Sequence, residues 1–179
     1  TMLVEGARSQ GLSSIALRYF NAAGAWPDQG LGEDHDPETH LIPNVLTSLL
    51  PLHGKIHKPG PVKIFGHDYA TDEGTCIRDY IHVRDLAEAH VLALHHLKGL
   101  TGALMLNLGS GSGNSVLEII QTCQQVTGRE IPYLVAPRRT GDPAVLVADN
   151  SLAGELLGWQ PQRNLMMIIE DAWRWHQKR

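Results

Sequence analysis

Short apolar runs typical of β-strands alternate with stretches of helical spacing along this chain, and that alternation limits the fold to one class. Apolar and β-branched residues predict strands at residues 14–20, 62–65, 81–83, 104–108 and 131–135. Apolar residues at helical spacing predict helices at residues 2–10, 40–50, 85–97, 116–126, 151–157 and 165–177. A chain that alternates strands with helices in this way is expected to form an α/β fold.

Capping residues predict where two of these helices begin. Asp85 is expected to cap one helix, with Glu88 three residues further on completing a capping box. Ser115 and Glu118 have the same relation at the start of the helix that follows the glycine-rich stretch.

The composition is that of a globular protein without an excess of basic residues. The 179 residues are 42% hydrophobic and 19% charged, and the formal net charge is −4. Nucleic-acid-binding proteins usually carry a basic face, so this balance argues against that class. No apolar run approaches the roughly 20 residues that cross a bilayer. The two cysteines are expected to be reduced thiols of a cytoplasmic protein.

Residues 66–83 carry more polar chemistry than a surface loop usually holds. They contain two glycines, four acidic residues, one arginine, two tyrosines and two histidines. The arginine, Arg78, stands close to Tyr80 and to acidic residues, and its planar guanidinium group can bind two oxygens at once. This stretch is therefore a candidate site for a phosphate or carboxylate ligand.

A second constellation joins this stretch to a later one. Arg139 and Asp142 follow the last predicted strand, and Arg78 follows an earlier one. Two arginines can neutralise a pyrophosphate, and Asp142 can accept hydrogen bonds from sugar hydroxyls. The alternative is a structural ion-pair network, either Arg78 with Asp79 or Arg139 with Asp142.

Asn21 stands at the end of a predicted buried strand and is followed by small residues and Gly24. Small residues let a ligand approach the backbone, and the asparagine side chain offers both a donor and an acceptor. We expect a binding role for Asn21. An ordinary strand end, with Asn21 capping a turn, is the alternative.

The glycine-rich turn at residues 109–113 follows a strand and precedes a helix, as a dinucleotide-binding motif would. Its spacing is Gly-x-Gly-x-Gly, without the third glycine in the usual place, and no acidic residue ends the next predicted strand. The interpretation we favour is a tight strand-to-helix connection.

The acidic loop at residues 32–40 contains four possible metal ligands, Asp34, His35, Asp36 and His40. Their spacing fits no compact metal geometry, and clusters of this kind are common on surfaces. We therefore expect a solvated loop and no metal site.

Residues 17–25, 66–83 and 136–143 together resemble the UDP-glucose 4-epimerases, which belong to the extended short-chain dehydrogenases. The resemblance runs from about residue 14 to residue 176. It implies the C-terminal portion of a Rossmann-type protein and its smaller substrate-binding domain. Residues 1–25 and 84–125 would be the last elements of the Rossmann sheet, and residues 26–83 and 126–179 would bind the UDP-sugar.

The resemblance also implies a set of site residues. Phe20 falls where the family meets NAD, and Lys63, Ile64 and Phe65 fall where it holds uracil. His40 is placed to donate a hydrogen bond to phosphate. The full set implied for the substrate is Asn21, His40, Leu41, Lys63, Ile64, Phe65, Arg78, Tyr80, Arg139, Asp142 and Leu146.

Two departures from the family pattern bear on the details. The connection formed by residues 51–61 is longer and more basic than the corresponding connection in the family. Leu146 stands where some members carry a tyrosine that limits the sugar pocket, and the shorter leucine predicts that the complete enzyme accepts N-acetylated UDP-sugars.

The family is an isomerase that interconverts UDP-glucose and UDP-galactose through NAD-mediated oxidation at carbon 4 of the sugar. A Tyr-x-x-x-Lys pair handles the proton, and none of the four tyrosines here has a lysine four residues later. The resemblance places that pair upstream of Thr1, so no catalytic residue is expected within this chain.

The chain also begins in what is predicted to be the middle of an element, at Thr1-Met2. We therefore expect a C-terminal piece of a longer protein that binds NAD weakly or not at all and is inactive alone. A homodimer, or association through unpaired sheet edges, is the expected assembly.

Two other interpretations stay open. One is a related enzyme, such as a UDP-pentose 4-epimerase or a 4,6-dehydratase, built on the same scaffold. The other is a non-catalytic module that binds a nucleotide with the retained part of the site.

Overall fold

The computed structural model describes residues 2–50 and 60–178 and confirms the α/β class. The helices are α1 (Met2–Gln10), α2 (Leu41–Thr47), α3 (Val83–Leu97), α4 (Val116–Thr127), α5 (Ser151–Leu157) and α6 (Leu165–His176), with a 3-10 turn η1 (Pro27–Gln29). The strands are β1 (Ser14–Tyr19), β2 (Asn21–Ala23), β3 (Val62–Phe65), β4 (Ile77–Arg78), β5 (Tyr80–His82), β6 (Ala103–Leu108), β7 (Asn114–Ser115), β8 (Tyr133–Ala136) and β9 (Val145–Leu146).

Two sequence predictions fall on positions outside the described part. Residues 51–59 make up most of the basic connection noted above. Thr1 is the residue that the expected catalytic pair would precede. The structure therefore tests neither the length of that connection nor the placement of the pair, and both stay predictions.

Parallel pairing dominates among the described strands. β1 pairs with β6, β2 with β5, β3 with β8, and β4 with β9, all in parallel, while β4 and β7 are antiparallel. Parallel strands need a crossover between them, and here helices and long connections supply it.

The chain changes sheet partner at residue 20. The backbone amide of Phe20 still donates to the carbonyl oxygen of Leu108, the last residue of β6, whereas the backbone amide of Asn21 donates to the carbonyl oxygen of Asp79, just before β5. Ligands of open α/β sheets bind beyond the carboxyl ends of parallel strands, at the point where strand order changes. The end of β1 is therefore where a site is expected.

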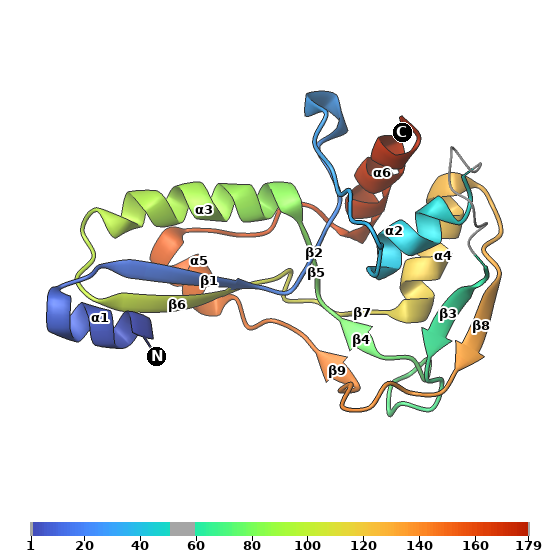
Figure 1. Ribbon diagram of the computed structural model, residues 1–179, viewed down its shortest axis with the longest axis horizontal. Coiled ribbons are helices and arrows are strands. Elements are labelled where there is room, and N and C mark those ends of the chain that lie inside the picture. Colours follow the sequence, from blue (N-terminus) through green and yellow to red (C-terminus); the bar gives the residue numbers. More distant parts are fainter. Residues whose placement is uncertain (1, 51–59, 179) are drawn as a thin grey trace.

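Two apolar cores lie at opposite ends of the molecule (Figure 1). One holds α2, α4 and α6, and its most deeply buried members include Leu46, Ile119 and Ile169. The other packs α3 and α5 against β1 and β6, around Leu106 and Leu108.

Two helices pack against elements from the other part of the expected division, and the division itself stays a prediction. α4 falls within the stretch expected to belong to the Rossmann sheet, yet it packs against α2 and α6. α5 falls within the expected substrate-binding part, yet it packs against β6 and α3. Helical spacing shows that a helix has an apolar face but does not show which neighbour covers that face.

One predicted cap is correct and one is wrong. Ser115 accepts a hydrogen bond from the Glu118 amide at 3.0 Å, and the Glu118 carboxylate accepts one from the Ser115 amide at 2.6 Å. The cap of α3, in contrast, is His82, whose Nδ1 accepts from the Arg84 amide at 3.1 Å. Asp85 lies inside the first turn, fully buried, because its carboxylate binds the side chain and the backbone amide of Arg163.

Smaller differences concern strand limits. β2 and η1 follow residue 20, where the sequence predicted neither a strand nor a helix. β5 begins and ends one residue earlier than predicted, and β8 begins two residues later, after Ile131 has entered the core. Across residues 2–50 and 60–178, none of the helices is long and apolar enough to cross a membrane.

Candidate functional site

A cavity of about 1340 Å³ opens where the parallel strands end. Phe20 and Asn21 line it from the partner change at the end of β1, and Phe65 lines it from the last position of β3. Arg139 follows β8, which pairs with β3 and ends beside it. The site therefore lies at the carboxyl ends of two separate parallel pairs, the location that this class of fold uses for ligands.

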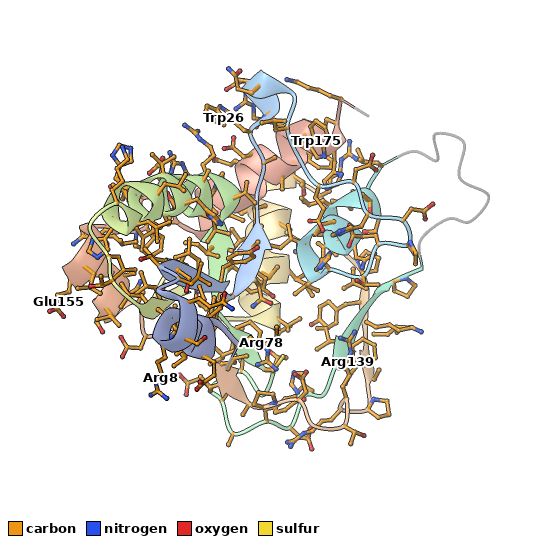
Figure 2. All side chains as sticks on the ribbon, turned by 60° about the vertical axis from the view of Figure 1, so that its left-hand side comes forward. Arg8, Trp26, Arg78, Arg139, Glu155 and Trp175 are labelled. Atoms are coloured by element: carbon orange, nitrogen blue, oxygen red, sulfur yellow. The ribbon has the colours of Figure 1, made fainter. Side chains whose placement is uncertain are left out.

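Two arginines that are far apart in the sequence face this one cavity. Arg78 and Arg139 are both lining residues, and Figure 2 shows them on the same side of the molecule. Asp142 and Cys76 line the same cavity. The sequence predicted that these side chains converge, and the structure brings them together.

Among the arginines and aspartates of the lining, Arg78 pairs with Asp142. The alternatives considered from the sequence, Arg78 with Asp79 or Arg139 with Asp142, are not the pairs that form. Arg78 also donates to the Ile77 carbonyl oxygen at 2.7 Å, and its side chain is only 12% exposed. The guanidinium group is therefore held in place before any ligand arrives.

Arg139 is held differently. Its guanidinium carbon lies 4.0 Å from the centre of the Phe65 ring, a cation–π contact that orients the charge without consuming its hydrogen-bond donors. Arg139 is exposed, and no salt bridge to it is found in the described part of the chain. Its donors can therefore serve an anionic ligand.

Burial keeps two further lining groups neutral. Desolvation raises the pKa of the Tyr80 hydroxyl far above its usual range, so it can donate a hydrogen bond but cannot act as a base near neutral pH. Desolvation also raises the pKa of the Cys76 thiol, although Arg78 partly opposes this. Neither group is a nucleophile or base in this state.

Most of the remaining residues expected in the site also line the cavity. They are Asn21, His40, Leu41 and Lys63. The side-chain amide of Asn21 donates to the Asp79 carbonyl oxygen at 2.9 Å. Two do not. Ile64 is 1% exposed and points into the core, because alternate residues of a strand face opposite sides. Leu146 is 47% exposed and stands outside the lining. The binding roles expected for this set remain predictions.

Sequence reasoning missed several lining residues, among them Trp26, Glu33 and Arg84. The Arg84 guanidinium carbon lies 4.7 Å from the centre of a Trp26 ring, so the two form one wall. Arg84 lies in the first turn of α3, directly after β5, and Trp26 follows β2, so the pairing of β2 with β5 brings the two side chains near each other. No local sequence pattern signals such a contact.

The glycine-rich turn is not a phosphate-binding loop. The Asp79 carboxylate, which is fully buried, accepts hydrogen bonds from the amides of Ser110 at 2.7 Å and Gly111 at 3.1 Å. A β-carbon on Gly109 would come within 2.5 Å of that carboxylate, and one on Gly113 within 2.3 Å of Ile77. The glycines are required by packing, which confirms a tight strand-to-helix connection.

A cavity at the carboxyl ends of parallel strands, with two positioned arginines, is typical of an α/β nucleotide-binding protein. The chain belongs to the NAD dependent epimerase/dehydratase family, whose sequence model matches residues 1–109.

Relatives of known name agree with that assignment. UDP-glucose 4-epimerase of Halalkalibacterium halodurans is 53% identical over 171 residues, which cover 94% of this chain and 49% of that protein. The structure of UDP-glucose 4-epimerase from Brucella ovis in complex with NAD is 48% identical, with a TM-score of 0.85, covering 96% of this chain and 51% of that one. The enzyme from Bifidobacterium longum, solved with NAD+ and UDP, is 36% identical, with a TM-score of 0.86, covering 97% and 50%. The chain thus spans about half the length of the relatives it matches.

Proposed function

We propose that this chain supplies the UDP-sugar-binding part of a UDP-glucose 4-epimerase, an isomerase that interconverts UDP-glucose and UDP-galactose. The observation that carries the proposal is the convergence of Arg78 and Arg139 on one cavity at the ends of parallel strands. Arg78 is fixed by its pairing with Asp142, and Arg139 keeps its donors free of salt bridges within the described residues. Two arginines on one cavity suit a diphosphate, because each guanidinium group can bind two oxygens at once. A relative solved with UDP, 36% identical, supports this choice of ligand.

The roles proposed for the other residues follow from their chemistry. Phe65 offers an apolar face for the uracil ring at the end of β3, with Lys63 on the same strand. Asp142, which pairs with Arg78, accepts hydrogen bonds from ribose or sugar hydroxyls. Tyr80, held in its protonated form, donates a hydrogen bond.

In the complete enzyme NAD would supply the hydride acceptor for carbon 4 of the sugar. Phe20 is the residue of this chain that we propose to meet it, since Phe20 lines the cavity where β1 ends. The glycine-rich turn has no part in holding NAD, because Asp79 already occupies its amides.

The proton-handling pair is proposed to lie outside the sequence in hand. Residues 1–179 contain no Tyr-x-x-x-Lys pair, so in the complete enzyme that pair would stand upstream of Thr1. We therefore propose that this chain by itself holds NAD weakly or not at all and does not epimerise.

The test is a calorimetric titration of the chain with UDP. Measurable affinity is expected for the natural chain, and Arg139→Ala should weaken binding about 10- to 100-fold, the loss typical of a charged hydrogen-bonding partner. The control is Arg8→Ala, which removes an exposed arginine on α1, away from the cavity lining. That variant should bind UDP like the natural chain.

No affinity for UDP, or equal losses in both variants, would contradict the proposal. Turnover of UDP-galactose by the purified chain would contradict the claim that it is inactive alone. UDP affinity without turnover fits this proposal and also the non-catalytic alternative. A longer protein that contains this chain and approaches the length of its relatives would distinguish the two possibilities. It should turn over UDP-galactose if the chain is part of an epimerase, and it should not if the chain is a non-catalytic module.

The sugar range is a finer proposal. Leu146 lies on β9, paired with the lining residue Arg78 of β4 although it is not itself part of the lining. We propose that the complete enzyme also accepts N-acetylated UDP-sugars, because leucine leaves space that a tyrosine would fill. An enzyme that turns over UDP-glucose but never UDP-N-acetylglucosamine would contradict this.

A further inference from the structure

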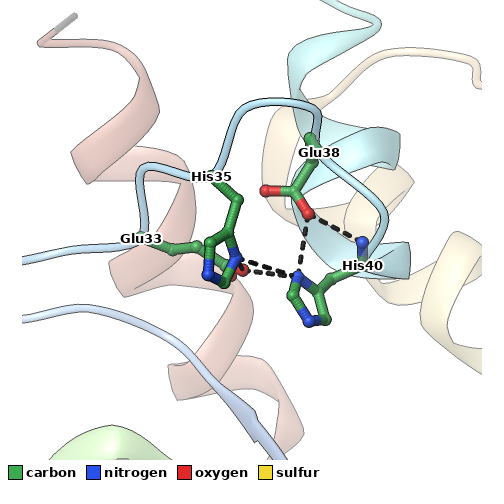
Figure 3. A group of neighbouring side chains, drawn as sticks. All are labelled: Glu33, His35, Glu38 and His40. Atoms are coloured by element: carbon green, nitrogen blue, oxygen red, sulfur yellow. Dashed lines mark hydrogen bonds and ion pairs between the residues drawn. The ribbon is translucent and has the colours of Figure 1, made fainter.

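The loop that leads into α2 gathers two histidines and two glutamates at one point (Figure 3). Glu33, His35, Glu38 and His40 each offer one ligand atom, and these four atoms all lie within 4.8 Å of one another. The sequence pointed instead to Asp34 and Asp36 as partners of the histidines and favoured a solvated loop. The turn of the chain places the glutamates there.

The contacts within this cluster exceed what hydrogen bonding can satisfy. His40 Nδ1 lies 2.6 Å from Glu33 Oε1 and 2.9 Å from Glu38 Oε1, while His35 Nδ1 lies 2.8 Å from Glu33 Oε1 and 3.3 Å from His40 Nδ1. If both Nδ1 atoms carry a proton, the His40 proton can be shared between the two glutamates and the His35 proton serves Glu33, but the two N–H groups then face each other at 3.3 Å. If one of them lacks its proton, its lone pair faces a carboxylate oxygen. A cation between the four atoms would satisfy all of them.

We propose that these four residues bind a divalent transition-metal ion, with Zn²⁺ the ion that the ligands fit best. Imidazole nitrogen with carboxylate oxygen is a zinc ligand set, whereas Ca²⁺ and Mg²⁺ prefer oxygen ligands throughout. Tetrahedral bonds of about 2.0 Å separate the ligand atoms by about 3.3 Å. The two nitrogens already stand at 3.3 Å, the N···O contacts of 2.6–2.9 Å need to open, and the wider pairs, which are up to 4.8 Å apart, need to close.

Charge and access support the same ion. The two carboxylates carry two negative charges, which a divalent cation neutralises. Their side chains are only 20% and 15% exposed, while those of His35 and His40 are 61% and 52% exposed. The anionic ligands are therefore partly desolvated, yet an ion can enter from solvent past the imidazole rings.

The loop is held at both of its ends, which prepares the ligands. The Trp175 indole of α6 donates to the Glu33 carbonyl oxygen at 2.8 Å, and Gly32 packs so closely on that ring that a β-carbon would come within 2.3 Å. At the other end His40 is the N-cap residue of α2. A rigid backbone lowers the entropy cost of gathering four ligands.

Four protein ligands leave no open position, so the ion would be structural. Glu33, His35 and His40 also line the large cavity, and the ion would therefore fix one of its walls. With Nδ1 of His40 bound to metal, only its Nε2 is left to meet a ligand in the cavity. This inference concerns the loop alone and stands independently of the choice of UDP as ligand.

The test is calorimetric titration of the 179-residue chain with ZnCl2 in a buffer that does not chelate zinc. The natural chain is expected to bind one ion, and His35→Ala should weaken binding by at least about tenfold. His95→Ala removes an exposed histidine of α3, outside the cluster, and should leave zinc affinity unchanged. Circular dichroism of each variant checks that the fold persists.

Glu33→Gln provides a second variant that keeps the size of the side chain and removes its charge, and it too should weaken zinc binding. Co²⁺ bound to the natural chain should give the visible spectrum of a tetrahedral ion, and His35→Ala should lose it. Absence of zinc binding, or equal zinc affinity in His35→Ala and the natural chain, would overturn the proposal. An octahedral Co²⁺ spectrum would do the same.

Discussion

At the scale of single residues, the buried carboxylate of Asp79 organises the turn beside the cavity. It accepts from the amides of Ser110 and Gly111 and from that of Ala148, at 2.7, 3.1 and 3.1 Å. Asp79→Asn replaces one acceptor oxygen with a donor facing other donors. We expect the free energy of unfolding to fall by about 1–3 kcal/mol, measured by urea denaturation.

Asp72→Asn makes the same change at an exposed position and is the control for that experiment. It should alter stability little. Equal unfolding midpoints for the two variants would contradict the role given to Asp79.

A second residue-scale prediction concerns pH. Burial raises the pKa of the Cys123 thiol from 9.0 to about 12. Above pH 9 the unfolded chain releases this proton while the folded chain keeps it, so unfolding becomes easier as pH rises. The free energy of unfolding should fall by up to about 1.4 kcal/mol per pH unit from this group between pH 9 and 12.

Cys123→Ala removes the group that binds a proton differently in the folded and the unfolded chain. The free energy of unfolding of the variant should therefore fall less steeply with pH over the same interval. The comparison uses the slope against pH, because the substitution also changes packing. Parallel slopes for variant and natural chain would show that the thiol has its ordinary pKa in the folded state.

At the scale of elements, the capping box of α4 fixes how that helix leaves the turn beside the cavity. Ser115→Ala removes the side-chain acceptor for the Glu118 amide and should lower the free energy of unfolding by about 1 kcal/mol. Ser9→Ala, within the exposed α1, is the matched control and should cost less. Thermal or urea unfolding decides between the outcomes, and a larger loss for Ser9→Ala would contradict this account.

Element limits were predictable where the signal is local. The Ser115 cap and the helix that Gly158 ends are set by neighbouring residues, and the structure agrees with both. The prediction that Asp85 caps α3 was wrong, because its carboxylate binds Arg163, a residue distant in the sequence. Tertiary partners override a local pattern, and sequence spacing gives no sign of them.

At the scale of the whole molecule, apolar side chains remain exposed on several elements. On α3 and β8 they include Val91, Leu92, Leu94, Tyr133, Leu134 and Val135. Within the described residues the β1–β6 sheet has only two strands, so each has an unpaired edge. We expect the isolated chain to self-associate, and light scattering during gel filtration should show a mass that rises with concentration. A single monomeric mass at every concentration would contradict this.

In the candidate site too, contacts that depend on tertiary structure could not be predicted from local sequence. Arg78, Arg139 and Asp142 could be assigned to one site because a family resemblance joins segments far apart in the sequence. The meeting of Glu33 with His35 and His40 could not, since it depends on how one loop folds back between α6 and α2. Side chains that meet through loop conformation leave no periodic pattern in a sequence.

We propose that Arg78 and Arg139 together hold a diphosphate. The most direct measurement is a crystal structure of the chain grown with UDP. The account predicts the diphosphate between the two guanidinium groups and the uracil ring against Phe65. A structure in which bound UDP touches neither arginine would contradict it.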